Sequence, residues 1–475
     1  MNKKFCMFFF IFCICLKSNA TTLQYFQSAI IKNNPAIHAM QLENKIQNNL
    51  LEIQRDIENK QVLIEPSVHF EKPISNQYMS PISLSTMGFD ISKSQLIPKN
   101  GASLAFLYNF SVIDQDTKAL TINDESQEFS KPLSYQNRLT FRYQLPLLKN
   151  FKGLLSYYPY KKQIQVKKLV ELQILENIEM FVVQKSIEYL EWVYLYHQYL
   201  VALDQKKIMN EQLLTVKQRL NQGLVEQIDF LRAEDAFRNA ERDLVLTQDK
   251  YVAQATFLSE ISKDDIFLNE DPKFDFIDVQ TANFLTQNEI VDLLRIKKQK
   301  EVHLLQFDED ITAKKEEIKS VLNLNVEAGL QGEDKQISTD FLPQKPVVSA
   351  SIFYELKQEN KRVMKELENL MIEKQSVSAD YESRLLEKLA RIKKLTLELD
   401  SIKKVIKINI KNKKSAELTY MEETRRYNNG IGDLRYVIAA KENQNRVKNS
   451  LNENYFLFHK MYIQYQAECD SVVLK

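Results

Sequence analysis

The sequence predicts a mainly α-helical protein with a β-barrel part, assembled from a duplicated helix-strand-strand-helix-helix unit. Glycine and proline are scarce, with 8 and 11 copies in 475 residues, where average usage is roughly 7% and 5%. Both residues interrupt helices, so their scarcity favours long helices. Short segments in which apolar and polar residues alternate predict strands between these helices. Two similar blocks in the same order indicate the duplication.

The composition excludes several classes of protein. An apolar content of 44% supports ordered structure, and a net charge of +1 gives no electrostatic case for binding nucleic acid. The five histidines are dispersed without metal-ligand spacing, and neither a phosphate-binding loop nor a Gly-x-Ser-x-Gly elbow is present. We therefore expect no enzyme activity, no cofactor and no metal. The many carboxylates are expected to lie on solvated helix faces.

Residues 1–20 are predicted to be a signal peptide. Lys3 and Lys4 precede the apolar run 5–16, and a small-x-small cleavage pattern follows at 18–20. The cysteines in this segment lack the usual lipoprotein context, so lipidation is not expected. The remaining chain keeps Cys469 alone and cannot form an internal disulfide. It also contains no apolar run of the roughly 20 residues that a transmembrane helix needs.

Two repeats follow, at 21–270 and 284–475, and each contains a helical hairpin. Helices are expected at 23–60, 157–220, 229–260, 284–320, 358–427 and 433–468. The hairpins 157–260 and 358–468 each break at glycine, at Gly223 and at Gly430 with Gly432. RLNQGLVEQIDFLRA at 219–233 aligns without gaps with RYNNGIGDLRYVIAA at 426–440. Glycine permits the positive φ with which a helix stops and reverses.

Each repeat also contains two predicted strands. They lie at about 62–72 and 136–146 in the first repeat, and at about 321–331 and 346–356 in the second. In the segment 139–145, Leu, Phe, Tyr and Leu alternate with Thr, Arg and Gln. A half-buried sheet and a lipid-exposed barrel both require this alternation. The predicted signal peptide and the aromatic residues on the apolar faces favour the barrel. The stretch 73–134 is expected to be an inserted loop with an added strand or hairpin.

Three motifs in order resemble the TolC-type outer-membrane efflux family over nearly the whole chain after residue 20. They are LQYFQSAIIKNNPAIHAM at 23–40, YQLPLL at 143–148, and the paired hairpin tips at 219–244 and 426–444. The resemblance implies a homotrimer in which four strands per subunit close a twelve-stranded transmembrane barrel, embedded in outer-membrane lipid. It further implies an α-barrel tunnel that extends into the periplasm and meets an adaptor protein and an inner-membrane transporter.

The resemblance also assigns candidate site residues. The tips that contact the adaptor are Arg219, Asn221, Gln222, Gly223, Leu224, Arg426, Asn428, Asn429, Gly430 and Ile431. The periplasmic gate is assigned to Asp229, Tyr427, Tyr436 and Arg435, with Asp229 and Tyr427 as polar partners. The barrel lumen is assigned to Arg138, Arg142, Glu327 and Glu355.

Two departures from the family pattern affect the gate. Gly432 stands where better-known members carry arginine, and the acidic constriction ring falls on Tyr436 and Ala439. We therefore expect the gate to close by packing of Tyr427 and Tyr436 more than by ion pairs. From the residues alone, Asp229 and Asp433 are expected to begin helices, where a carboxylate favours the helix dipole.

The expected function is a passive exit duct of a tripartite efflux pump or a type I secretion system. Two alternatives stay open: a periplasmic adaptor protein, and an exported coiled-coil scaffold without a pore. An adaptor normally has one hairpin and this chain has two tip motifs, which favours the duct. The transported substrate cannot be deduced from the sequence.

Overall fold

A computed structural model describes residues 21–55, 60–71, 81–117, 120–122, 125–127, 133–273, 279, 284–334, 343–356 and 361–472. The predicted signal peptide lies outside these residues. The chain divides into two compact units. The helical unit comprises Met1–Asn44, Glu171–Lys298 and Tyr381–Lys475, and the sheet unit comprises Lys45–Val170 and Gln299–Asp380. Each unit therefore draws on both predicted repeats.

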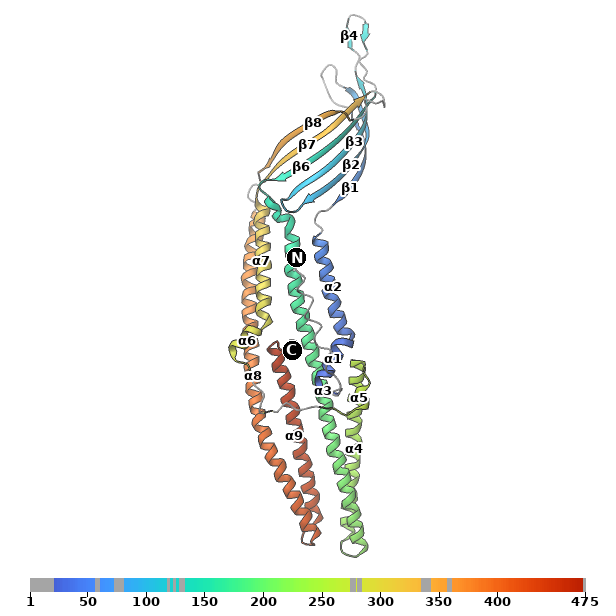
Figure 1. Cartoon of the computed structure of the whole chain (residues 1–475), viewed down its shortest axis with the longest axis vertical. Helices are drawn as coiled ribbons and strands as arrows, with labels where there is room; N and C mark the ends of the chain where they lie inside the picture. Colours follow the sequence, from blue (N-terminus) through green and yellow to red (C-terminus); the bar gives the residue numbers. More distant parts are fainter. Residues whose placement is uncertain are drawn as a thin grey trace, which may run out of the picture. The chain divides into compact units, whose positions relative to one another are not determined.

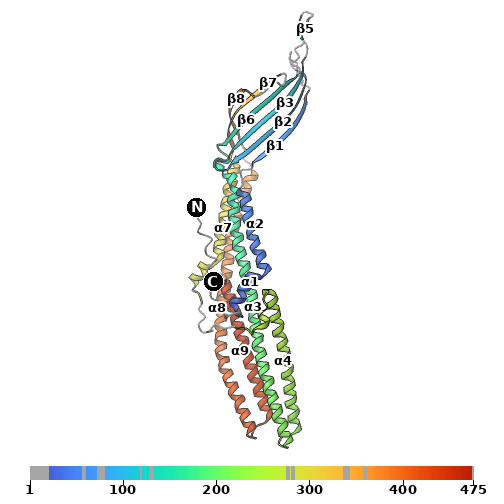
Figure 2. The ribbon, with the colours of Figure 1, turned by 45° about the vertical axis from the view of Figure 1, so that its right-hand side comes forward.

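The two longest helices are equal in length and occupy matching places in the repeats. Both α3 and α8 have 68 residues, and each is followed by a second helix of 36 or 35 residues. Figure 2 shows α4 beside α3 and α9 beside α8. The helices are α1 (Leu23–Asn33), α2 (Pro35–Arg55), α3 (Leu154–Asn221), α4 (Gln227–Ser262), α5 (Ile266–Asn269), α6 (Gln287–Leu293), α7 (Arg295–Ile318), α8 (Lys361–Asn428) and α9 (Leu434–Glu468). No described helix is both long enough and apolar enough to cross a membrane.

Two of the predicted helices are each divided in the structure. The helix expected at 23–60 breaks at Asn34, whose side-chain oxygen accepts a hydrogen bond from the Ala36 N–H at 2.9 Å. Pro35 then begins α2, where its missing N–H costs nothing. The helix expected at 284–320 breaks at Leu294, whose backbone is extended between α6 and α7.

The helical unit has one apolar core for each hairpin. Phe26 of α1, Trp192 of α3 and Leu258 of α4 are fully buried in the first core. In the second core, Leu294, Leu399 of α8 and Phe458 of α9 take corresponding places. Trp192 also contacts Tyr189, Tyr251 and Phe267 through its ring, so it packs a core as expected for a mid-helix tryptophan.

The sheet unit contains one antiparallel sheet in the order β1-β2-β3-β6-β7-β8 (Figure 1). Its strands are β1 (Gln61–Glu71), β2 (Pro81–Ile97), β3 (Ala102–Thr117), β6 (Ser134–Pro146), β7 (Val321–Asp334) and β8 (Lys345–Glu355). The short strands β4 (Leu120–Ile122) and β5 (Glu125–Gln127) form a separate pair. The four strands predicted from sequence are all present, with ends within three residues of the predictions.

The predicted count of four strands per chain is wrong, because the sheet formed by the described residues has six. Residues 73–134 were expected to form a loop with an added strand or hairpin. The added hairpin is present, and its strands β2 and β3, of 17 and 16 residues, insert into the main sheet between β1 and β6. A twelve-stranded barrel from three chains required four strands each, and this premise does not hold here.

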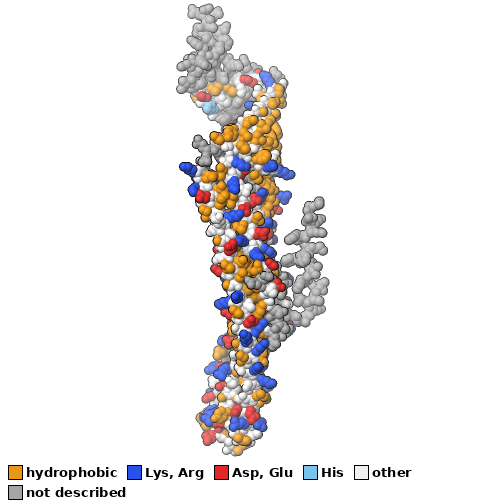
Figure 3. Space-filling view, turned by 90° about the vertical axis from the view of Figure 1, so that its left-hand side faces the viewer, with side chains coloured by type: hydrophobic (Ala, Val, Ile, Leu, Met, Phe, Trp, Pro, Cys, Tyr) orange, Lys and Arg blue, Asp and Glu red, His pale blue; other side chains and the backbone are white. Residues whose placement is uncertain are grey.

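Pairing registers give the sheet one apolar and one polar face. One row across the sheet joins Ile64, Ile91, Tyr108, Leu139, Leu330 and Pro346. The neighbouring row joins Glu65, Asp90, Asn109, Arg138, Gln331 and Lys345. Since side chains alternate across a strand, these rows lie on opposite faces. Figure 3 shows the hydrophobic side chains gathered over the sheet, whereas charges of both signs cover the helices.

The turn between β2 and β3 packs against the joint between β6 and α3. Gly101 and Gly153 both have positive φ, of 71° and 68°. A Cβ atom on Gly153 would fall on the Pro98 carbonyl oxygen, and one on Gly101 would lie 2.6 Å from the Asn150 carbonyl oxygen. The Asn150 side chain in turn accepts hydrogen bonds from the N–H groups of Leu155 and Ser156 at the start of α3. The hairpin is therefore seated by close backbone contact.

Candidate functional site

The two hairpin tips have the same backbone geometry. In the first tip, the Leu224 N–H donates to the Arg219 carbonyl at 2.9 Å and the Gly223 N–H donates to the Leu220 carbonyl at 3.0 Å. In the second tip, the equivalent bonds run from Ile431 to Arg426 at 3.0 Å and from Gly430 to Tyr427 at 3.1 Å. This pair of bonds defines a Schellman motif, with glycine at the left-handed position. The glycine reversals predicted from sequence are confirmed.

Both tips present apolar side chains to solvent. Leu224 and Ile431 occupy equivalent positions and are 69% and 74% exposed. Nothing lies within 4 Å of a Cβ atom placed on Gly223 or Gly430. The remaining predicted tip residues, apart from the half-buried Arg219, are exposed too. The contact with an adaptor that sequence assigned to these residues remains a prediction.

The tips meet each other through Arg219 and Tyr427. The Arg219 guanidinium carbon lies 4.5 Å from the centre of the Tyr427 ring, and Nη1 donates to the Tyr427 carbonyl at 3.3 Å. Beneath them, Val216, Ala233 and Leu434 form a small buried cluster from α3, α4 and α9. A cation over an aromatic face contributes about 0.5–2 kcal/mol, depending on exposure. This contact ties the first hairpin to the second.

Within the described residues of one chain, Asp229 and Tyr427 do not form the expected hydrogen bond. The Tyr427 hydroxyl is buried and has no hydrogen-bond partner among the described residues. Asp229 instead pairs with Arg232 at 3.3 Å, one helical turn along α4. The physical reason is local, since Arg232 is Asp229's neighbour at i+3 while Arg219 covers the tyrosine ring. Sequence reasoning did not identify Arg232, although its spacing from Asp229 is typical of a helical ion pair.

Asp433 begins α9 as predicted, and Asp229 lies in the first turn of α4. The Asp433 carboxylate accepts from the Arg435 N–H at 2.8 Å and from the Arg435 guanidinium at 2.6 Å. Hydrogen bonds from the Arg435 side chain and backbone hold the pKa of Asp433 below its ordinary value. Tyr436 is 61% exposed, so the structure of one chain does not bring it into the packed cluster with Tyr427.

On the polar face of the sheet, three of the four predicted lumen residues come together. The Arg142 guanidinium lies 2.5 Å from one Glu327 oxygen, and Arg138 lies 3.7 Å from the other. Glu327 therefore bridges two arginines that lie four residues apart on β6 and share one face, with Thr140 between them. Glu355 lies on this face as well, but at the far end of β8, where it pairs in register with Val321.

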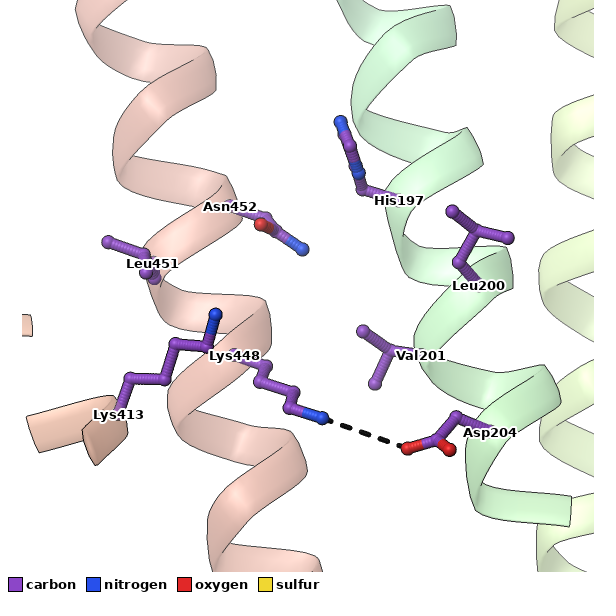
Figure 4. A pocket seen from close by; sticks show the side chains of 8 residues that line it. All are labelled: His197, Leu200, Val201, Asp204, Lys413, Lys448, Leu451 and Asn452. Carbon is purple, nitrogen blue, oxygen red and sulfur yellow. Dashed lines mark ion pairs between the residues drawn. The ribbon is translucent and has the colours of Figure 1, made fainter. Parts of the chain in front are cut away.

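A cavity of about 250 Å³ lies between α3, α8 and α9 in the helical unit (Figure 4). On its wall, Asp204 of α3 faces Lys448 of α9 at 3.7 Å. Asp204 also accepts a hydrogen bond from Lys441 at 2.9 Å. Burial lowers the pKa of Lys441 below its ordinary value, and Asp204 opposes this effect. The polar cluster joins the two hairpins, and no sequence motif indicated it.

The helical unit also contains a buried charge network that contradicts the expectation of solvated carboxylates. Asp470 is 2% exposed and accepts from the Arg295 N–H at 2.6 Å and from Lys388 at 2.8 Å. Glu179 is 3% exposed, pairs with the Arg295 guanidinium, and accepts from the Val472 N–H at 2.8 Å. These carboxylates can be buried because each meets a cation and a backbone donor.

The fold thus combines two long helical hairpins with an antiparallel sheet that has one apolar face. A comparison with solved structures finds this fold in CusC, whose crystal structures concern folding and transmembrane channel formation. CusC is 12% identical to this chain, the match covers 96% of this chain and 95% of CusC, and the TM-score is 0.67. The outer membrane protein VceC of Vibrio cholerae has 13% identity over 94% and 96% of the two chains and a TM-score of 0.64. The outer membrane channel CmeC of Campylobacter jejuni has 11% identity over 94% and 85%, and a TM-score of 0.63.

These similarities confirm, at the level of fold, the resemblance to TolC-type channels that the sequence indicated. No protein-family model matches the sequence, and no curated protein matches it. At 10–13% identity, the structural neighbours share the fold with this chain while nearly all side chains differ.

Proposed function

We propose that the chain is a TolC-type exit channel located in the outer membrane and extending into the periplasm. It assembles as a homotrimer and passively conducts substrates to the exterior, as the outer component of a tripartite efflux pump or a type I secretion system. It receives substrates from a periplasmic adaptor protein and an inner-membrane transporter that supplies the energy. The two repeats, 21–270 and 284–475, each contribute one helical hairpin to the tunnel wall.

The observation that carries this proposal is the division of the sheet into two faces. Val62, Val348 and Ile352 on the apolar face are 64–76% exposed, which is costly in water and favourable in lipid. The opposite face carries the Arg138–Glu327–Arg142 cluster, as a water-filled lumen requires. A transmembrane strand takes about 9–11 residues, and the edge strands β1 and β8 have 11 each.

The hairpin tips support the proposed adaptor contact. Each tip exposes one large apolar side chain, Leu224 or Ile431, beside polar neighbours. Their matched geometry gives a trimer six similar contact points. Cysteines placed at Gln222 or Asn429 should crosslink to the adaptor. If neither position crosslinks, the adaptor contact does not lie at the tips.

Adjacent substitutions on β8 test the membrane location. Ala350→Arg puts a charge on the apolar face, where it costs roughly 2–4 kcal/mol near the bilayer centre. Ser349→Arg puts the same charge on the polar face and serves as the matched control. We expect the wild type and the Ser349 variant to fractionate with the outer membrane as heat-sensitive trimers in unheated gels, and the Ala350 variant to be depleted.

The same fractionation separates the alternatives. A wild-type protein recovered in the soluble or inner-membrane fraction would contradict the channel and favour the adaptor or the scaffold. A deletion strain challenged with antibiotics, dyes, metals and candidate secreted proteins would then identify the class of substrate. Unchanged sensitivity and secretion across all four classes would contradict the export function.

A further inference from the structure

The sheet of this chain has two unpaired edges, and their directions are complementary. β1 and β8 are the outer strands of a six-stranded antiparallel sheet, so they run in opposite directions. Their outward backbone groups have no partner strand among the described residues. In lipid, unpaired strand edges are not tolerated. The β8 edge of one copy can accept the β1 edge of the next in antiparallel fashion.

The inserted β2–β3 hairpin preserves this complementarity. Adding two strands keeps the strand number even, so β8 and β1 stay antiparallel after the insertion. The hairpin also continues both faces of the sheet. Phe106 and Phe141 are paired on the apolar face, and the Asn109 amide donates to Asp90 at 2.6 Å on the polar face.

The hairpin is a full part of the sheet wall. It pairs with β1 over 11 positions and with β6 over 11 positions. Its inner turn is fixed by Gly101 and Gly153 at the joint that begins α3. A hairpin that folded away from the barrel would lose this contact and would separate β1 from β6, which share no direct pairing.

We propose that three copies close an eighteen-stranded barrel through β8-to-β1 pairing, with the inserted hairpin widening the outer opening. The number of copies rests on the proposed function. The partner at each edge is a second copy of this chain, because the two edges continue the same apolar and polar faces. A head-to-tail contact of this kind closes into a ring when the rotation between copies permits it.

The additional strands change the width of the pore substantially. With strands about 4.8 Å apart and tilted by about 45°, the backbone diameter is about 26 Å for twelve strands and about 39 Å for eighteen. Inward side chains occupy about 5 Å at each wall, which leaves a lumen of about 29 Å. A helix with its side chains is about 10–12 Å wide, so a polypeptide containing a helical hairpin would fit through this opening.

Cysteine crosslinking tests the edge pairing. In a Cys469→Ala background, cysteines placed along the polar face of β1, such as Ser67→Cys, are combined with Ser349→Cys or Ser351→Cys on β8. At least one combination should give a covalent ladder that ends at three subunits. Ser111→Cys on the interior strand β3 replaces the β1 cysteine as a control and should give no ladder. A ladder that ends at two subunits, or none from any combination, overturns the proposal.

Electron microscopy of the purified full-length protein tests the strand number directly. End-on views should show the backbone diameter of eighteen strands, about 39 Å, and a wild-type barrel with the twelve-strand diameter of about 26 Å overturns the proposal. Deleting 81–127 removes β2 to β5 and should narrow the barrel to the twelve-strand diameter, with β1 beside β6. If this variant fails to assemble, the wild-type diameter still decides.

The two proposals fail separately. An export-competent strain whose channel has the narrow, twelve-stranded barrel keeps the proposed function and rejects the eighteen strands. If the barrel has eighteen strands but deleting the protein changes neither drug sensitivity nor secretion, the eighteen strands are kept and the proposed function is rejected.

Discussion

The contact between Arg219 and Tyr427 gives the most direct test of the proposed gate. Three substitutions of Tyr427 separate its possible contributions. Phenylalanine keeps the ring and removes a hydroxyl that has no partner among the described residues. Leucine keeps most of the packing against the Val216–Leu434 cluster and removes the aromatic face. Alanine removes both. If an Asp229–Tyr427 hydrogen bond closed the gate, phenylalanine would already open it.

The structure predicts a different order. Loss of a buried hydroxyl without a partner is nearly neutral, so Tyr427→Phe should behave as wild type. Tyr427→Leu loses the guanidinium–ring contact at 4.5 Å, worth about 1 kcal/mol at a partly exposed site. In the proposed trimer the three contacts, one in each chain, lose about 3 kcal/mol together, which shifts the closed-to-open equilibrium about 100-fold. Tyr427→Ala should exceed this value because its ring packing is lost as well.

Single-channel recording in planar bilayers measures this shift as the fraction of time spent in the open state. Arg219→Gln provides the reciprocal variant and should match Tyr427→Leu, since both remove the same contact. A leucine variant with the open fraction of the wild type would refute the role of the aromatic face. A phenylalanine variant as open as the leucine variant would instead restore a role for the hydroxyl.

Three further predictions concern stability. Asp470→Asn should lower the free energy of unfolding by about 3–5 kcal/mol, because it leaves the buried Arg295 with one ion-pair partner fewer. Asp292→Asn, in an exposed ion pair, should lower it by under about 1 kcal/mol. Urea unfolding of both variants measures the difference. Gly153→Ala should reduce the yield of the proposed trimer on unheated gels far more than Gly223→Ala. Both glycines have positive φ, but only at Gly153 would a Cβ atom meet backbone atoms. Burial lowers the pKa of His459 from 6.5 to about 4. The stability that its neutral form gives is therefore complete above pH 6.5 and falls by up to roughly 3 kcal/mol toward pH 4. On acidification the urea midpoint should fall less in His459→Gln than in the wild type, and equal acid sensitivity would contradict the reasoning.

Much of the helical part was predictable because a few residues mark its boundaries. Gly223 and Gly430 end their helices in the left-handed conformation, which residues with a side chain rarely adopt. Their positions therefore define the hairpin tips from sequence alone. The shared offset between the repeats also holds for the N-caps Glu226 and Asp433. The breaks at Asn34 and Leu294 were missed because the apolar pattern continues across both.

The number of strands was harder to predict. β3 alternates cleanly from Leu104 to Val112, but β2 does not. Lys93 and Gln95 of β2 lie in register with apolar-face residues of β3, so they interrupt the pattern that reveals a strand. Sequence alone therefore indicated an added strand or hairpin without placing it in the main sheet.

The candidate site was predictable in position and less so in its contacts. Polar alternation on β6 placed Arg138 and Arg142 on one face, and the structure adds their common partner Glu327. The bonds of Asp229 and Tyr427 depend on which arginine lies nearer in space, and spacing does not show this. Burial of Glu179 and Asp470 is equally invisible, because a carboxylate that will be buried has the same sequence context as a solvated one.

The buried network around Glu179 has a consequence for the timing of folding. Its hydrogen-bond donor Val472 follows it by 293 residues. At about 5–20 residues per second, synthesis of that interval takes roughly 15–60 s. During this time the Glu179 carboxylate lacks a backbone donor that its buried site needs, and the first core also lacks Ile463 although Trp192 and Leu258 have long been synthesised. The first hairpin is thus synthesised long before its core can be completed, and it must stay protected from aggregation and proteolysis for that period.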